Sequence, residues 1–136
     1  MSKQSILYLL TGLALGVLIS GCGSGKLQTK GRILKNGAAY IPAEGDIVRV
    51  MFVPITEGNE RVTDFHAAIV DPEDGTFQAA GRDGQGVPPG KYRIAVEHLR
   101  NRADLLKGAF DAVHSPFVCE LKSSADEVTI DLAKPK

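Results

Sequence analysis

The sequence predicts an all-β domain, arranged as a sandwich or a barrel. Two runs, 46–54 and 91–98, alternate apolar and polar residues, which is the pattern of a half-buried strand. Pairs that favour tight turns, Asn36-Gly37 and Pro89-Gly90, stand between such runs. The sequence contains no internal repeat, and one stretch near the C-terminal third breaks the alternation.

Composition limits the chain to one domain and excludes some partners. Of 136 residues, 115 remain if the first 21 are removed, which is enough for one domain and too few for two. The 16 basic and 16 acidic residues balance, and loss of Lys3 leaves 15 against 16. A net charge near −1 gives no electrostatic reason to expect nucleic acid as a partner.

The N-terminus carries one positive residue, Lys3, and then an uncharged, mostly apolar run over residues 6–19. This run is shorter than the roughly 20 apolar residues that a transmembrane helix needs. Its length matches the hydrophobic region of a secretory signal peptide. We therefore expect residues 1–21 to be a signal segment.

The glycine-rich stretch before Lys26 raises the alternative of a phosphate-binding loop. That motif needs a glycine at position 20 and a serine or threonine at position 27, so that backbone amides and a hydroxyl reach phosphate and Mg²⁺. Ser20 and Leu27 occupy these positions instead. The pattern therefore disfavours nucleotide binding, and we expect no cofactor.

The signal segment ends in an aliphatic residue, two small residues and a cysteine: Ile19, Ser20, Gly21 and Cys22. This order resembles the lipobox of bacterial lipoproteins, many of which have leucine where this chain has Ile19. The resemblance implies cleavage before Cys22 and acylation of its thiol, so that Cys22 is the lipid attachment residue. Several acyl chains give a stable membrane anchor, whereas one gives marginal binding. The alternative is an ordinary secretory signal with an incidental cysteine.

The lipobox resemblance implies three parts: a signal peptide (1–21), a lipidated tether (22–26) and a β-domain (27–136). The glycine-rich tether is short and flexible. Gly23 follows the cysteine, where an aspartate often retains lipoproteins at the inner membrane. The resemblance thus implies a lipid-anchored protein of the cell membrane or, with Gly23, the outer membrane, with its domain on the non-cytoplasmic side.

The first part of the domain predicts two alternating strands. Residues 27–34 lead into Asn36-Gly37, a pair typical of a hairpin turn. Residues 46–54 end at Pro54, which suits a strand end because proline has no N–H for the ladder. The positions that share one face in these strands are Leu27, Thr29, Gly31 and Ile33, and then Val48, Val50 and Phe52.

The middle of the domain predicts a strand at 64–70 and an acidic turn at 71–75. In this turn we expect Asp74 to accept local backbone N–H groups and Gly75 to adopt a positive φ. Phe77 then points inward from the next strand.

A loop over 81–90 precedes the clearest strand, and Pro89-Gly90 in it fits a type II turn. Two further strands, within 115–122 and 127–132, finish the domain. The inward positions of the strand at 91–98 are Tyr92, Ile94 and Val96.

Residues 102–113 carry apolar side chains at helical spacing, which predicts two or three turns of helix. Gly108 weakens such a helix by about 1 kcal/mol relative to alanine. We expect a crossover connection that packs Leu105, Ala109 and Phe110 over one end of the sandwich. The alternative is an exposed amphipathic segment that docks a partner.

Five short sequence motifs follow one another along the chain in an order that is known from a protein family. They read KGRILKNG, VRVMFVP, DPEDGTF, GVPPGKYRIAVEH and SPFVCEL. Together they resemble the small carboxypeptidase-regulatory-like (transthyretin-like) lipoproteins of planctomycete-type bacteria, over nearly all of the mature chain. The most specific parts are Asp74-Gly75 with Phe77, and Pro89-Gly90 with Tyr92.

This resemblance implies a Greek-key β-sandwich of about seven strands without catalytic activity, acting as a structural or interaction module. Lys35-Asn36-Gly37 departs from the family's usual Asp-Gly-Lys turn, and the stretch at 102–113 is longer and more apolar than usual. These departures put the first hairpin and the late connection in question. Hydroxyisourate hydrolases of the same fold end in Tyr-Arg-Gly-Ser, whereas this chain ends in DLAKPK, so their active site does not carry over.

The remaining chemical groups give weak signals. His66, His98 and His114 are far apart and lack the spacing of metal ligands, so a metal site would have to assemble in space. We expect His66 and His98 to be strand positions near an edge or end, and Cys119 to be a small core residue. The acidic turn at 71–75 lacks the length of an EF-hand loop.

We therefore expect a membrane-anchored envelope lipoprotein whose β-sandwich is a non-catalytic interaction or structural module. Its expected partners are the membrane, through Cys22, and an envelope protein. The alternative is a domain that binds a peptide or glycan. Trp is absent, and of the two tyrosines in residues 22–136 we expect Tyr92 in the core, which leaves Tyr40 for sugar stacking. An enzyme with a spatially assembled site is a third hypothesis.

Overall fold

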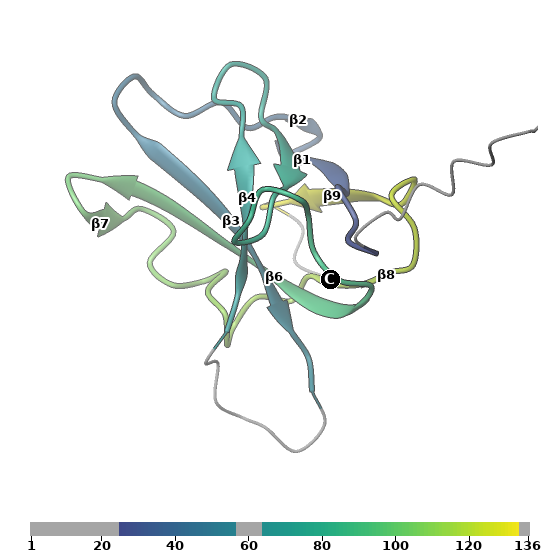
Figure 1. Cartoon of the computed structure of the whole chain (residues 1–136). Coiled ribbons are helices and arrows are strands. Elements are labelled where there is room, and N and C mark those ends of the chain that lie inside the picture. Colours follow the sequence, from purple (N-terminus) through teal and green to yellow (C-terminus); the bar gives the residue numbers. More distant parts are fainter. Residues whose placement is uncertain (1–24, 57–63, 134–136) are drawn as a thin grey trace, which may run out of the picture.

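A computed structural model describes residues 25–56 and 64–133 of the chain (Figure 1). The signal segment and Cys22 lie outside these residues. The described residues contain strands and turns but no helix, so the all-β prediction is confirmed, and none of them forms a helix able to cross a membrane. The strands are β1 (Lys30–Lys35), β2 (Ala38–Ala39), β3 (Ile47–Pro54), β4 (His66–Val70), β5 (Thr76–Ala79), β6 (Gly90–Arg100), β7 (Ala103–Asp104), β8 (Val118–Leu121) and β9 (Glu127–Asp131).

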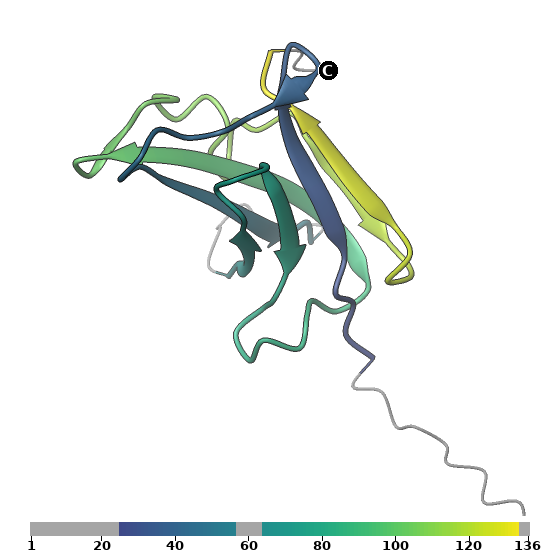
Figure 2. The ribbon, with the colours of Figure 1, turned by 90° about the horizontal axis from the view of Figure 1, so that it is seen from above.

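The strands form one continuous hydrogen-bonded sheet. β9 pairs with β1, β1 with β5, β5 with β4, β4 with β3, β3 with β6, and β6 with β8. The two-residue strands β2 and β7 extend β1 and β6 as short hairpins. Every pair is antiparallel except β1 with β9, which is parallel. The sheet curls, so that β1 and β9 face β3 and β6 across a shared interior (Figure 2).

The interior is built from the alternate positions of these strands, as the sequence predicted. Phe52 at its centre meets the rings of Phe77 and Tyr92 edge to face, with centroids 6.2 and 5.9 Å away. Each such side chain contributes about 1.5–3 kcal/mol when it leaves water. The largest fully buried side chains are Phe52, Ile33, Ile94, Leu121, Ile130, Val50, Val87, Val96 and Thr29.

A close approach at Gly31 joins three strands. Gly31 lies opposite Phe77 of β5 on one side and Val128 of β9 on the other. A Cβ at position 31 would be 2.3 Å from the Phe77 ring and 2.4 Å from the Val128 carbonyl oxygen. Because Gly31 has no side chain, the Phe77 ring can pack directly against the backbone of β1.

Two predicted turns are confirmed. Asn36 and Gly37 both have positive φ, 55° and 79°, as a type I′ hairpin turn requires, and this turn joins β1 to β2. In the acidic turn, the Asp74 carboxylate accepts the backbone N–H of Thr76 at 2.8 Å, and Gly75 has a φ of 72°.

The type II turn predicted at Pro89-Gly90 is wrong. Gly90 has a φ of 157°, far from the +80° of that turn, and it is already the first residue of β6, opposite Leu121. The chain reverses earlier in the loop, where Gly86 has a φ of 110°. There the backbone lies against Leu27, and a Cβ on Gly86 would be 2.3 Å from the Leu27 carbonyl oxygen.

The helix predicted for residues 102–113 is also wrong. Lys107 and Gly108 have positive φ, 53° and 74°, which a right-handed helix excludes. The Asp104 carboxylate accepts the backbone N–H groups of His98, Leu106 and Gly108. These bonds offer the backbone an alternative to the helical ladder, and the segment becomes a series of turns.

This segment runs along the free edge of β6 instead. The carbonyls of Phe110 and Phe117 accept the N–H groups of Val96 and Ile94, at 2.8 and 2.9 Å. The two phenyl rings stack, with centroids 5.6 Å apart. Of the three side chains expected to pack on the domain, Phe110 is buried, whereas Leu105 and Ala109 are exposed.

The strand directions separate the domain into two ends. At the tether end, β1 and β6 begin side by side (Figures 1 and 2), and Leu27 pairs with Val87 through backbone bonds of 2.7 and 2.9 Å. At the distal end lie the end of β6, which turns back into β7, and the loop at 40–46, which His98 holds through Tyr40 and Asp46.

We predict that Gly31→Ala destabilises the domain by roughly 3 kcal/mol, because the added methyl overlaps a ring and a backbone oxygen that cannot both retreat. Urea unfolding followed by circular dichroism measures this. Thr129→Ala, at an exposed position of β9, is the control and should change stability by less than about 0.5 kcal/mol. An unchanged midpoint for Gly31→Ala would contradict the close packing described for β1.

Candidate functional site

The residues singled out from the sequence do not come together in one place. His66 begins β4, and its ring contacts Tyr92 in the interior, with centroids 6.1 Å apart. His98 lies in β6 at the distal end, so both strand placements are confirmed. His114 is exposed and pairs with Asp111 at 2.9 Å. Among the described residues, no three His, Cys, Asp or Glu side chains gather as a metal site would require.

The distal end instead holds a polar cluster of four side chains, which we call the distal cluster: Tyr40, Asp46, His98 and Arg100. The Tyr40 hydroxyl lies 2.5 Å from His98 Nδ1, and His98 Nε2 lies 2.7 Å from Asp46 Oδ2. Arg100 donates two hydrogen bonds to the same carboxylate, from Nε to Oδ1 at 2.9 Å and from Nη2 to Oδ2 at 2.8 Å. The side chains of His98 and Asp46 are 8% and 4% exposed and are largely shielded from water, whereas the Arg100 side chain is 52% exposed.

The charges in the distal cluster determine which atom donates each bond. The Arg100 hydrogen bonds, and then the His98 bond, lower the pKa of Asp46 to about 2, so its carboxylate is ionised and accepts. His98 Nε2 must therefore carry a hydrogen and donate a hydrogen bond to the Asp46 carboxylate. In the neutral imidazole, Nδ1 is then an acceptor, and the Tyr40 hydroxyl donates to it.

This order of carboxylate, imidazole and hydroxyl is that of a nucleophilic triad, but its electrostatics differ. Burial, and then the negative charge of Asp46, raise the pKa of the Tyr40 hydroxyl above its ordinary value. An activated nucleophile needs the opposite shift or an available base. Here Arg100 and His98 already use both carboxylate oxygens of Asp46. The arrangement therefore fixes the loop at 40–46 onto β6, and burial keeps the Tyr40 hydroxyl protonated at neutral pH, although His98 Nδ1 lies within reach of it as a base.

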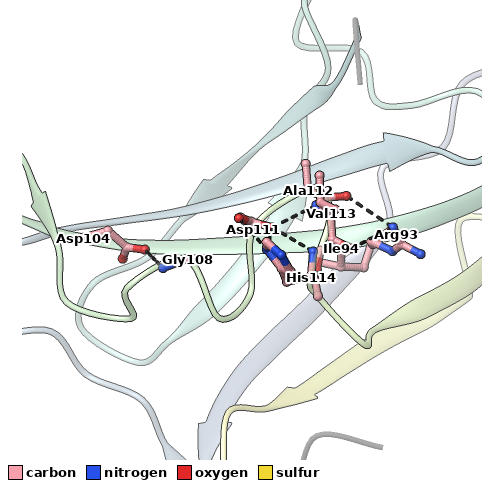
Figure 3. A network of polar contacts seen from close by, with 9 residues as sticks. Arg93, Ile94, Asp104, Gly108, Asp111, Ala112, Val113 and His114 are labelled. Carbon is pink, nitrogen blue, oxygen red and sulfur yellow. Dashed lines mark hydrogen bonds and ion pairs between the residues drawn. The ribbon is translucent and has the colours of Figure 1, made fainter. Parts of the chain in front are cut away.

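A second polar network holds the segment at 104–117 (Figure 3). Asp111 accepts the backbone N–H groups of His114 and Val113, at 2.7 and 2.9 Å. The bonds from the backbone and side chain of His114, and then the bond from Val113, lower the pKa of its carboxyl. Arg93 Nη1 donates to the Val113 carbonyl at 3.1 Å. The buried Ser115 hydroxyl donates to the Ile94 carbonyl at 2.5 Å. Side chains thus supply bonds that a regular edge strand would supply from its backbone.

A groove of about 850 Å³ lies on the outer face of β1, β4 and β5 and reaches the turn at 71–75. It offers hydrogen-bonding groups from Thr76 and Gln78 and charges of both signs. Tyr40, the tyrosine expected to stack on a sugar, does not line this groove. Its hydroxyl is hydrogen-bonded to His98 in the distal cluster. The lining residues are Lys30, Gly31, Arg32, Ile69, Val70, Asp71, Pro72, Glu73, Thr76, Phe77, Gln78 and Glu127.

Cys119 lies half-buried in β8 and packs against the core, as predicted. Burial, and then the nearby charge of Asp126, raise the pKa of its thiol to about 11. The thiol therefore stays protonated at neutral pH and is a poor nucleophile.

Comparison with known proteins gives no relative from which a role could be transferred. No family model, no curated protein and no solved structure matches this chain.

Sequence reasoning missed the distal cluster. The sequence pattern suggests Tyr40 for sugar stacking and His98 as a strand position, and it indicates neither Asp46 nor Arg100. One signal was present: the alternation of β6 puts His98 on the same inward face as Tyr92, Ile94 and Val96. A histidine on a buried face needs a hydrogen-bond partner, but nothing local identifies that partner.

We predict that Asp46→Asn lowers stability at neutral pH and flattens the acid part of the stability profile. The folded pKa of Asp46, about 2, lies below the unfolded value of about 3.9, so its contribution is complete above about pH 5 and is lost as pH falls towards 2. Chemical unfolding at a series of pH values measures this. Glu44→Gln removes an exposed carboxylate of the same loop and is the control. Parallel profiles for wild type and Asp46→Asn would contradict the pairing.

Proposed function

We propose that this chain is a lipid-anchored protein of the bacterial cell envelope, whose β-domain is a non-catalytic interaction or structural module. The observation that carries the proposal is the sequence Ile19-Ser20-Gly21-Cys22 directly after an uncharged apolar run. In this proposal residues 1–21 are removed and the acylated Cys22 holds the protein to the cell membrane or outer membrane. The domain then lies on the non-cytoplasmic side.

The short tether agrees with this arrangement. Residues 23–26 separate Cys22 from Leu27, and Leu27 is fixed to Val87 in the folded domain. Five peptide steps from Cys22 to Leu27 span at most about 17 Å. An acylated Cys22 would thus keep the tether end near the membrane and leave the distal end facing away.

We propose further that the domain is a Greek-key sandwich of the transthyretin-like type. The order β1-β5-β4-β3 supports this, because three hairpin-connected strands, β3 to β5, are completed by β1, which reaches β3 through a long connection. The curl of the sheet around one core supports the sandwich (Figure 2).

Two observations support the absence of catalysis. In the part of the chain that the structure describes, the hydroxyl of Tyr40 and the thiol of Cys119 are the groups placed most like nucleophiles, and burial raises the pKa of both. The Asp46 carboxylate that could assist Tyr40 through His98 is bound by Arg100.

The second candidate function, binding of a peptide or glycan, has one observation in its favour. The groove beside the acidic turn presents amide, hydroxyl and charged groups on an exposed sheet face. A matched test compares binding of envelope peptidoglycan fragments by wild type and by Gln78→Ala, which alters the floor of the groove without touching the core.

We predict that Cys22→Ser abolishes membrane attachment. Expressed with its own signal, the wild-type chain should begin at Cys22, carry acyl mass and sediment with membranes, whereas the variant should carry no acyl group and remain soluble or uncleaved. Intact mass spectrometry with membrane fractionation measures both properties. Cys119→Ser is the control and should keep the anchor. A wild-type chain that is soluble and cleaved elsewhere would contradict the proposal.

A further inference from the structure

An exposed apolar patch lies on the outer face of β3, β6 and β8, close to the tether end. Its side chains are between 38% and 62% exposed. We call this the outer patch, and its members are Ile55, Phe65, Val113 and Val118.

The strand register brings these side chains to one face. Phe65 precedes His66, whose ring points inward to Tyr92, so Phe65 points outward. Val118 lies opposite Arg93 in the ladder, while the next pair, Cys119 and Tyr92, faces the core. The Ile55 N–H donates to the carbonyl of Lys91 at 2.9 Å, which continues β3 along the same face.

Two cations lie within the outer patch, and neither has a carboxylate partner among the described residues. Arg93 donates from Nη1 to the carbonyls of Ala112 and Val113, and its buried Nε has no partner there (Figure 3). Lys91 also forms no ion pair with any described residue. Glu120, which lies opposite Lys91 in the ladder, pairs with Lys122 at 3.6 Å. Among residues 25–56 and 64–133, the outer patch thus combines apolar side chains with two cations, Lys91 and Arg93, that form no ion pair there, although the Glu120 carboxylate lies opposite Lys91.

The outer patch is close to the point where the tether joins the domain. Leu27 is paired with Val87, and four residues further along the chain is Lys91, at most about 14 Å away. The tether itself allows at most about 17 Å between Cys22 and Leu27. A membrane that holds Cys22 is therefore within reach of the outer patch.

We propose that the outer patch rests on the anionic surface of the membrane that holds the anchor, an inference that depends on the lipid anchor at Cys22. Apolar side chains of this kind enter the boundary between headgroups and acyl chains, and lysine and arginine attract anionic lipids. Weak contacts suffice, because the anchor makes the encounter intramolecular and its effective concentration high. The domain then lies with β3, β6 and β8 towards the lipid and the distal cluster exposed to the envelope.

The test places a fluorescent label at one position of the full lipidated chain in vesicles of phosphatidylcholine and phosphatidylglycerol that contain brominated lipid. Phe65→Cys carries the label in the outer patch, and Ile41→Cys, equally exposed at the distal end, is the matched control. Acylation blocks Cys22, and the raised pKa of the Cys119 thiol keeps it from competing for the label at neutral pH. We expect a blue shift and loss of emission at position 65, with no change at position 41.

Charge is tested separately with Lys91→Glu, which should reduce lipid quenching at position 65, whereas Lys107→Glu at the distal end should not. Removing phosphatidylglycerol, or raising ionic strength, should have the same effect as Lys91→Glu. Vesicle flotation with equal quenching at positions 65 and 41 overturns this proposal alone. Protection of position 65 from a water-soluble quencher without lipid quenching also overturns it, because a protein then covers the patch. Failure to float overturns the anchor and this proposal together.

Discussion

The ladder between β3 and β6 is the interaction on which the rest of the domain depends. It pairs eight consecutive residues, from Ile47 with Leu99 to Pro54 with Tyr92. Because successive side chains alternate between faces, this single register turns His98 inward and Arg93 outward. A slip of one residue would put His98 into solvent and Arg93 into the core. The distal cluster and the outer patch are thus two ends, and two faces, of the same pairing.

Local chemistry predicted local structure well. Asn36-Gly37 forms its hairpin turn because the φ angles that the turn needs are properties of those two residues. Predictions failed where a contact or side-chain hydrogen bond that the local pattern does not show competes with local preference. Gly90 is extended because β8 pairs with it, and the reversal occurs near Gly86, where Leu27 leaves no room for a side chain. The helical spacing of residues 102–113 does not produce a helix, because the Asp104 carboxylate within this segment accepts hydrogen bonds from three backbone N–H groups.

The site was harder to predict than the fold, for the same reason. Strand alternation identified the buried face of β6, but the partners of His98 come from positions 58 and 52 residues away in the chain. Tyr40 and Asp46 lie in a connection without alternation, where a sequence gives no register. The proposed lipid anchor is the opposite case, because the pattern that resembles a lipobox is contiguous in sequence and is recognised without a fold. For this reason the anchor is proposed from the sequence alone, whereas the distal cluster is seen only in the structure.

The two ends of the β3–β6 ladder differ in whether their charged side chains are paired within the described residues, and this difference bears on the proposed function. At the distal end, the Asp46 carboxylate is buried but receives bonds from both Arg100 and His98, so its charge is compensated within the domain. At the tether end, Arg93 is left with a buried Nε that has no partner among the described residues, and it lies beside exposed apolar side chains. Stability does not require such a surface, because exposed apolar groups contribute little to folding and favour association. In the proposed membrane contact, an anionic lipid surface would offer negative charge to the exposed Lys91 and a less polar medium to the apolar groups, on the side of the domain where Leu27 pairs with Val87.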